Sequence, residues 1–465
     1  MTINKIAIFQ KILFCELFPF AQKQMAIKLN PHFIHLSSSF IYSFETKQKY
    51  RVHKNDFTRI RKLPFEELVL CMLKLLRHTI QKELNSFLKE IQGSTGSAIK
   101  KISSSAFVQS RKKLKPDMFF DLNNLIATDY YIDNDEKVKL YKGLRILSID
   151  GSSLNLPVTE ELKNSYGVFN NQSKTNDVII ARVSVLYDVL NELILDGKLC
   201  PFSTGEVPLS RSHCKYASKG DLIIMDRAYP SFESAYLMQQ QGIDFLFRCK
   251  HSFSNQVKSF YESGKREYIM ELKPKENQSF TDLSYDATSV ITVRMLRIEL
   301  PSGETEILMT SLLDTEKHPY KDFKELYFKR WKVETFYNRF KNIIGVECFS
   351  GTSNQFIQQE FNCALYVSNM QTILTEDAQM EADKKYQHRK YEYKINSSLS
   401  LGFIRERLVK ILSKQSESQI LLKEMEELFT IHVIPIRPGR NNIRNPGKYR
   451  RRSKPKQFKN RRIVL

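Results

Sequence analysis

The sequence predicts an α/β protein, with a mixed α+β central region flanked by helical regions. Two short apolar runs, at 144–149 and 222–225, have the composition of buried strands, and each is followed at once by an aspartate. Apolar residues recur at helical spacing at 64–91 and again at 403–429. Strands that alternate with helices are typical of layered α/β folds. The length of 465 residues predicts two or three domains.

Residues 1–135 are predicted to form an N-terminal helical region. The helical spacing of 64–91 is broken at 93–97 by glycine and serine, and Ser103 can cap a following helix. The edge at 109–113, which includes Arg111, is cationic and suits contact with nucleic acid. A plain helical bundle with a basic surface explains the same pattern equally well. No function is inferred for the first sixty residues, which lack a sustained period.

The central region is predicted to span 141–375. Its first strand leads into Asp150, and a tight turn is expected at Gly151. Carboxylates at the ends of neighbouring strands of a mixed sheet point into one crevice, where open α/β sheets carry their sites. Taken singly, either aspartate is more often a simple turn residue. The remaining elements are expected as strands at 178–188 and 193–199, a helix at 209–217, the strand before Asp226, a helix at 232–241 and a strand at 245–249.

Three further segments follow from composition. A mostly β insertion is predicted at about 250–318, with strands at 289–298 and 306–313. A charged stretch at 376–394 is expected to separate the central region from C-terminal helices, giving a linker and helical region over 376–436. The tail, 437–465, contains 12 Lys and Arg and no Asp or Glu, so it is predicted to be disordered until it meets nucleic acid. A solubilising role is the alternative.

A predicted helix before Gly345 carries Tyr327, Arg330, Glu334 and Lys341. At about 100° per residue these four fall within an arc of roughly 60°, so they share one face. An ordinary solvated helix face is the alternative, but a tyrosine and a carboxylate flanked by cations at fixed turns favour a functional face. The opposite side of this helix is apolar and comprises Val333, Phe336, Phe340, Ile343 and Ile344.

The motifs together resemble a known family. Asp-Gly-Ser at Asp150, Asp-Arg-Ala-Tyr at Asp226 and the Y-(2)-R-(3)-E-(6)-K spacing from Tyr327 to Lys341 look like the DDE transposases of bacterial insertion sequences, of the insertion sequence four family. The resemblance covers about 60–415 and implies a ribonuclease H-like catalytic core with a β insertion, preceded by a helical DNA-binding region. Some members carry a second lysine one turn after the glutamate, where this chain has Asn338.

The resemblance implies metal-dependent endonuclease and polynucleotidyl transferase chemistry. Asp150, Asp226 and Glu334 are expected to be the catalytic residues and the ligands of two Mg²⁺ or Mn²⁺ ions, with Asp150 bridging the ions. Hard cations of this kind prefer oxygen donors and keep positions open for water and phosphate. Two such ions can activate an oxygen nucleophile and stabilise the leaving oxygen. Water would first nick the element end, and the exposed 3′-hydroxyl would then attack target DNA.

Other motif residues are expected to bind DNA. Arg330 and Lys341 suit phosphates beside the metals. Tyr327 is expected to hydrogen-bond a phosphate or to orient the glutamate. Trp331, the only tryptophan, can stack on a displaced base or pack under the insertion, and packing is the expectation.

Two roles are possible for the residues that follow Asp226. Arg227 and Tyr229 can touch the scissile strand or brace the turn that follows Asp226.

The net charge and the spacing of the cysteines limit the kinds of protein that fit this sequence. A net charge of +21 with a pI of about 9.5 favours a polyanionic partner, which the family implies is DNA at the element ends and in the target. Seven scattered cysteines without C-x-x-C spacing argue against a disulfide scaffold or a zinc site, and His213 is expected on a helix surface. No membrane span or signal peptide is recognised, so a cytoplasmic, nucleoid-associated bacterial protein is expected, acting as a homodimer that joins two element ends.

Two rival functions share these features. Another ribonuclease H-like nuclease would use the same acids but would not explain the spacing from Tyr327 to Lys341. An inactive, transposase-derived DNA-binding protein would place no demand on the acids, which are intact here.

Overall fold

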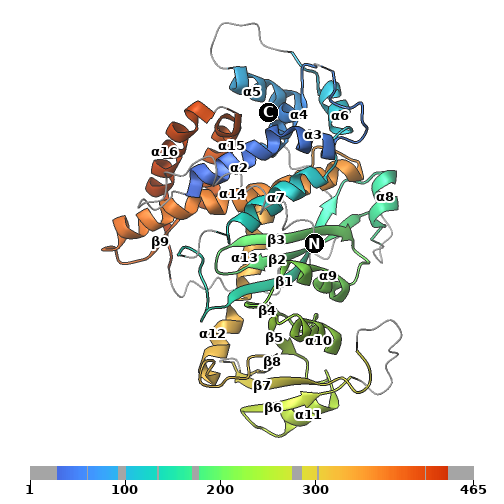
Figure 1. The fold of residues 1–465 in the computed structure, drawn as a ribbon, viewed down its shortest axis with the longest axis vertical. Helices are drawn as coiled ribbons and strands as arrows, with labels where there is room; N and C mark the ends of the chain where they lie inside the picture. The colour runs from blue at the N-terminus through green and yellow to red at the C-terminus, as the bar shows by residue number, and fades with distance from the viewer. Residues whose placement is uncertain are drawn as a thin grey trace, which may run out of the picture.

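The fold is taken from a computed structural model, which describes residues 29–59, 61–92, 101–132, 136–169, 177–274, 285–300, 303–413 and 415–437. Figure 1 shows helices gathered at one end, a large sheet in the middle and a small β-rich part at the other end. The predicted helix break at 93–97, residues 301–302 and nearly all of the basic tail lie outside the described residues, as do residues 1–28.

Six helices form the described N-terminal region. The prediction of one helical run over 64–91 is wrong in its middle, because the chain leaves the helix at Lys74 and Leu75 adopts a φ of 53°. Ser103 does cap the helix after it, since its Oγ accepts a hydrogen bond from Ala106 N at 3.2 Å. The helices are α2 (Leu29–Tyr42), α3 (Phe44–Tyr50), α4 (Phe65–Leu73), α5 (Ile80–Gln92), α6 (Ser104–Arg111) and α7 (Asp117–Asp129).

One eight-stranded sheet organises the rest, in the order β3-β2-β1-β4-β5-β8-β7-β6. β1, β2 and β3 are antiparallel neighbours, whereas β4 and β5 run parallel to β1. This is the strand order of a ribonuclease H-like core, so the predicted fold class is confirmed. The strands are β1 (Arg145–Leu156), β2 (Ile179–Asp188), β3 (Leu193–Pro201), β4 (Asp221–Met225), β5 (Asp244–Cys249), β6 (Glu267–Leu272), β7 (Ile291–Glu299) and β8 (Thr305–Thr310).

The segment between the second and third acids extends this sheet. β8 pairs antiparallel with β5, and β7 and β6 follow it outward, with α11 (Asn255–Glu262) packed against β7. Two of its three strands match the predicted strands. β6 was not predicted, because Tyr268 and Ile269 are adjacent exposed hydrophobics, 48% and 46% exposed, on an edge strand without clean alternation.

The smaller helices of the core pack on the sheet. α8 (Glu160–Tyr166) and α9 (Glu206–His213) lie against β2, and α10 (Phe232–Gln240) crosses from β4 to β5. The prediction that His213 lies on a helix surface is wrong. It is fully buried, with Nδ1 2.8 Å from Asp196 Oδ2 and Nε2 2.9 Å from Ser184 Oγ, and burial lowers its pKa. This buried network joins α9 to β2 and β3.

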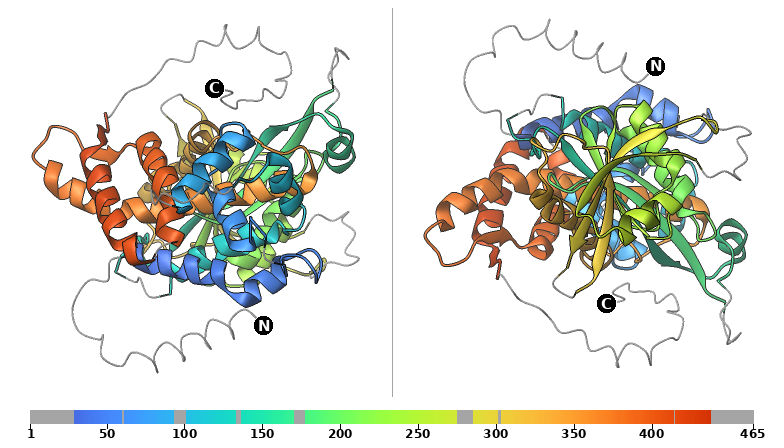
Figure 2. Two further views of the ribbon diagram at one scale, coloured as in Figure 1. Left: turned by 90° about the horizontal axis from the view of Figure 1, so that it is seen from above. Right: turned by 90° about the horizontal axis from the view of Figure 1, so that it is seen from below.

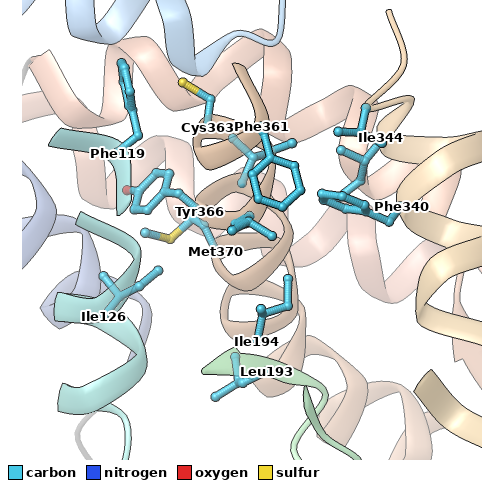
Figure 3. Close-up of a cluster of buried hydrophobic side chains, with 14 of the residues drawn as sticks. Phe119, Ile126, Leu193, Ile194, Phe340, Ile344, Phe361, Cys363, Tyr366 and Met370 are labelled. Atoms are coloured by element: carbon cyan, nitrogen blue, oxygen red, sulfur yellow. The ribbon is translucent and has the colours of Figure 1, made fainter. Parts of the chain in front are cut away.

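A long helix, α14 (Asn354–Tyr386), runs through the core. Figure 3 shows Phe361, Cys363, Tyr366 and Met370 of this helix among side chains from α7, β3 and the 340–344 segment. The predicted linker at 376–394 is therefore wrong in its first half, because α14 continues to Tyr386. Ala378 and Ala382, four residues apart and both fully buried, let the neighbouring helix approach this charged stretch closely.

The C-terminal helices α15 (Ser397–Ser413) and α16 (Gln415–Ile431) pack against α2, and α15 also packs against α4 and α5 (Figure 2). Arg405 fixes this arrangement by donating to Lys74 O at 2.9 Å and Leu75 O at 3.3 Å, at the break between α4 and α5. A two-stranded ribbon of β9 (Tyr393–Ile395) and β10 (Val433–Pro435) closes the chain. Both ends of the described chain thus build one helical body.

The predicted cationic edge at 109–113 loses its central residue. Arg111 is fully buried, its guanidinium 2.9 Å from Glu360 Oε1 and 2.7 Å from Ser350 Oγ, and it lies over the Phe356 ring. Arg111 therefore ties α6 to α14 rather than facing a ligand.

None of the described helices combines the length and apolar character that crossing a membrane requires. The cysteines of the described residues are all free thiols.

Candidate active site

The two aspartates lie on neighbouring parallel strands. Ser148 of β1 pairs with Ile224 of β4, and continuing that register by two residues sets Asp150 opposite Asp226. The turn expected at Gly151 is absent, because β1 continues to Leu156. The glycine serves a different purpose: a Cβ at Gly151 would lie 3.1 Å from the hydroxyl of Tyr229, so the glycine allows that ring to approach the strand.

Asp150 is the most perturbed acid of the group. The pKa of its carboxyl is raised from 3.8 to about 6, chiefly by burial and also by the nearby charges of Glu334 and Asp226. The Gly151 N–H, 2.8 Å from Oδ1, and the Arg330 guanidinium partly offset this. The three acids are therefore close enough for Glu334 and Asp226 to perturb Asp150 electrostatically.

The motif segment is helical but not one regular helix. α12 (Phe323–Phe328) and α13 (Trp331–Arg339) are separated by a tightened turn, in which Arg330 N bonds to Tyr327 O at 3.0 Å. A π-helical turn, η3 (Phe340–Ile344), then carries Lys341. The prediction of one regular helix is therefore wrong. The segment does end before Gly345, and the predicted apolar face is buried, with Val333, Phe336, Phe340 and Ile344 at most 2% exposed.

The four motif side chains nevertheless reach the two acidic strands. Tyr327 donates its hydroxyl to Asp226 Oδ1 at 3.3 Å. Arg330, whose side chain is only 5% exposed, donates to Glu334 Oε1 at 2.9 Å and lies 3.8 Å from Asp150 Oδ2. Lys341 donates to Ser152 Oγ on β1 at 2.7 Å. One helical segment therefore links the three acids, which lie 76 and 108 residues apart along the chain.

Two further residues of the site have no clear signal in the sequence. Tyr337 is buried on α13 and donates its hydroxyl to the backbone carbonyl of Asp150 at 2.7 Å, so it holds the strand against the helix. Arg248 on β5 lies 3.7 Å from Asp226 Oδ1 and 3.1 Å from Glu306 Oε1 on β8. The only signal for Arg248 was a charge within the otherwise apolar predicted strand at 245–249.

The remaining predicted DNA contacts separate into two groups. Tyr229 is 3% exposed, and burial beside the Asp150 charge raises its pKa, so it braces the site from within. Arg227 is exposed. Trp331 is 48% exposed, with the Arg330 guanidinium 5.0 Å from its ring centre, so the expectation that it packs under the insertion is wrong.

Comparison with known proteins settles the family. The family model described as "Transposase DDE domain" matches residues 142–370, which contain all three acids and the whole motif segment. The chain belongs to the DDE transposases. It is 21% identical over 288 residues to the transposase InsG for insertion sequence element IS4 of Escherichia coli strain K12, which confirms the resemblance to the insertion sequence four family.

The likeness to these proteins is partial. The aligned part covers 61% of this chain and 63% of the length of InsG. Among solved structures, the piggyBac transposase synaptic complex with hairpin DNA aligns over 90% of this chain and 89% of its own, at 12% identity and a TM-score of 0.40.

Asp150, Asp226 and Glu334 have the oxygen ligands that a hard divalent cation prefers. All three offer carboxylate oxygens, and Asp150 is desolvated next to two like charges that a cation would neutralise. Among the described residues, however, no three acidic, histidine or cysteine side chains are grouped closely enough to hold a metal ion. Arg330 lies between Asp150 and Glu334 instead, and its Nε is buried without a hydrogen-bond partner among the described residues. A metal at these acids therefore requires Arg330 to turn away.

Proposed function

We propose that this transposase cuts DNA at the ends of an insertion element and joins the cut ends to target DNA, using Asp150, Asp226 and Glu334 as its catalytic carboxylates. The observation that carries the proposal is the single motif segment that contacts all three acids, through Tyr327 and Arg330. A solvated helix face would not direct its tyrosine and its buried arginine to two aspartates on neighbouring strands.

The carboxylates of Asp150, Asp226 and Glu334 would hold Mg²⁺ or Mn²⁺. Such ions, when bound, lower the pKa of an attacking oxygen and stabilise the charge on the leaving oxygen. The protein supplies positioning. Tyr337 holds the Asp150 backbone, and Arg248 neutralises Asp226 from the side of β5.

The cations of the motif have a second role in this proposal. Arg330 would be released from Asp150 and Glu334 if these carboxylates bound a divalent cation. Its planar guanidinium would then suit a DNA phosphate, because it can donate two parallel hydrogen bonds. Lys341, at Ser152 on β1, is placed for an adjacent phosphate. The net charge of +21 supplies the sequence-independent part of the DNA affinity. Two copies, one at each element end, would form the working complex.

A nicking and strand-transfer assay tests the proposal. A supercoiled plasmid carrying the element ends is incubated with Mg²⁺ and either the wild-type protein or the variants Asp150→Asn, Asp226→Asn and Glu334→Gln. Each variant is expected to lose both nicking and strand transfer while retaining DNA binding. The matched control is Glu325→Gln, on the neighbouring helix α12, where the side chain is 81% exposed.

The outcomes separate the rival functions. Nicking that persists in Asp226→Asn rejects the assignment of the catalytic carboxylates. Nicking by the wild-type protein without strand transfer indicates a nuclease rather than a transposase activity. Binding without metal-dependent nicking indicates a DNA-binding protein that has lost catalysis.

A further inference from the structure

A cationic pocket of about 400 Å³ lies at the same edge of the sheet as the acids, beyond β5 and β8. It is formed where β6 begins and β7 ends, together with η2 (Tyr320–Asp322) and the first turn of α12. Neither the three acids nor the four motif residues line it, so the proposed function gives it no role. Its polar side chains are Arg266, Arg297, Glu299, Tyr320, Lys321 and Lys324.

The strand register places this pocket relative to Asp226. Leu308 of β8 pairs with Arg248 of β5 and with Leu296 of β7. Arg297 therefore lies one residue from the row that contains Arg248, the neighbour of Asp226. β7 and β6 are the third and fourth strands from β4 in the sheet order, and neighbouring strands lie about 4.8 Å apart. The pocket is thus about 14–19 Å from Asp226 along one edge of the sheet.

A ridge of side chains on η2 and α12 connects the pocket to the acids. Lys321, Lys324 and Tyr327 follow one another at intervals of three residues, which makes them neighbours on a helical surface. The two lysines line the pocket, whereas the Tyr327 hydroxyl donates to Asp226 Oδ1. A straight polymer that passes the acids can therefore also reach the pocket.

The charge of the pocket is strongly positive. Its wall contains four cations but only one carboxylate. Among the described residues, no carboxylate forms an ion pair with Arg297, Lys321 or Lys324. Arg266 lies 3.5 Å from Glu267, but that carboxylate is shared with a buried arginine of β7. Cations without a protein counterion around a pocket favour an anionic occupant.

The two guanidinium groups of the pocket are held in place by aromatic rings. The Arg266 guanidinium lies 4.7 Å from the centre of the Tyr320 ring. The Arg297 guanidinium lies 5.2 Å from the centre of the Tyr261 ring and donates to Tyr261 O at 2.8 Å. Tyr320 in turn donates its hydroxyl to Arg297 O. An arginine that is stacked in this way loses little freedom when its remaining N–H groups bind a phosphate.

We propose that this pocket holds backbone phosphates of double-stranded DNA outside the element, about four to six base pairs from the cleaved bond. This spacing follows from the distance along the sheet edge, because the base pairs of DNA are stacked about 3.4 Å apart. Cations that pair with phosphates carry no sequence information. Such contacts suit flanking and target DNA, whose sequence differs from one insertion to the next. The inference rests on the proposed function for the presence of DNA at Asp226, and it adds a contact that fixes where the DNA runs beyond the acids.

Binding measured without catalysis tests this inference. In EDTA, fluorescence anisotropy compares element-end duplexes that carry no flanking DNA, about three base pairs of it or about eight base pairs of it. We expect the affinity to rise between the two flanked duplexes, because only the longer flank reaches the pocket. The gain should be the same for flanks of unrelated sequence.

Variants at exposed positions locate the effect. Lys321→Gln/Lys324→Gln should remove the gain and lower the salt dependence of long-flank binding by about two phosphate contacts. Lys321→Arg/Lys324→Arg should keep both, because the charges remain. Glu299→Gln should increase the gain, because it removes the only carboxylate of the wall. The matched control, Lys215→Gln/Lys258→Gln, removes two exposed charges outside the pocket and should leave the gain unchanged.

A strand-transfer assay separates the two kinds of DNA outside the element. Precleaved element ends carry no flank, so their transfer into a plasmid in Mg²⁺ depends on target DNA alone. If the pocket holds target DNA, Lys321→Gln/Lys324→Gln should need several-fold more plasmid for half-maximal transfer, with the rate at saturating plasmid unchanged. If it holds only flanking DNA, this variant should transfer precleaved ends as the control does but still lose the flank-dependent gain in affinity.

The results distinguish this inference from the proposed function. A double variant that keeps the flank-dependent gain and also transfers precleaved ends as the control does overturns the pocket assignment and leaves the proposed function standing. A wild-type protein that binds no element-end duplex overturns the proposed function and this inference together.

Discussion

Asp150 is expected to reduce the stability of the metal-free protein, and removing its charge should reverse this. Its side chain is 20% exposed, and its pKa rises from 3.8 to about 6, chiefly through burial. Because one pKa unit corresponds to ~1.4 kcal/mol, the ionised carboxyl costs the folded state about 3 kcal/mol relative to the unfolded chain. Asn resembles the neutral acid in shape and can still accept the Gly151 hydrogen bond. Asp150→Asn should therefore raise the free energy of unfolding at neutral pH.

The sign of the pH dependence follows from the raised pKa. Below pH 3.8 the carboxyl is protonated in both states, so the variant and the wild type should be equally stable with respect to this group. As the pH rises through about 6, the folded wild type must give up a proton that it holds tightly, and it loses stability. The advantage of Asp150→Asn should grow from about 1 kcal/mol at pH 4.5 to about 3 kcal/mol at pH 7.5.

Urea unfolding in EDTA measures this difference at each pH, with Glu325→Gln as the exposed control. Added Mg²⁺ should stabilise the wild type and not the variant, because a ligand stabilises only the state that binds it. A variant that is equal to or less stable than the wild type at pH 7.5, with a normal urea dependence, would refute the reasoning that Asp150 is held ionised at a cost.

Three further substitutions test the framework of the site. Arg111→Met should lower the free energy of urea unfolding by about 3 kcal/mol, because it leaves Glu360 without its buried partner. Adding Glu360→Gln to the same protein should recover part of that loss. A variant that loses DNA affinity but not stability would instead indicate that Arg111 contacts DNA. Gly151→Ala should lower the free energy of urea unfolding by about 1–3 kcal/mol, because its Cβ would lie 3.1 Å from the Tyr229 hydroxyl. This loss should be smaller when Tyr229→Phe is also present. Tyr337→Phe should lower the free energy of unfolding by about 1 kcal/mol and slow nicking, because the Asp150 carbonyl loses its hydrogen-bond donor. Unchanged nicking would argue against a positioning role for Tyr337.

The part of the fold that the sequence predicted well is the part set by local pattern. The runs at 144–149 and 222–225 became β1 and β4 because mostly apolar stretches of that length bury themselves on both faces of a sheet. The acids that follow them then share one edge by virtue of parallel pairing. The spacing from Tyr327 to Lys341 was informative because α12, α13 and η3 carry these side chains to the same two strands, even though the three elements do not form one regular helix.

The features that the sequence did not predict depend on distant partners. Arg111 lies among exposed-looking cations, and only its pairing with Glu360, 249 residues later, takes it into the interior. Arg248 joins the site because β8 returns to β5 and brings Glu306 alongside. His213 is buried because Asp196 and Ser184 satisfy both of its ring nitrogens. No periodicity within a single segment carries this information.

The electrostatics of the site connect its architecture to its proposed chemistry. Asp150, Asp226 and Glu334 bring three acidic groups together, and Arg330 and Arg248 already neutralise much of that charge. The Arg330 side chain is only 5% exposed, and a buried charge that loses its partner is costly, so Arg330 can leave Asp150 and Glu334 only if another cation replaces it there. Conversely, a displaced Arg330 needs an anion, and a DNA phosphate is the anion that the proposed reaction brings. Cation and DNA should therefore each favour binding of the other, and the buried arginine of the motif is the group through which that coupling acts.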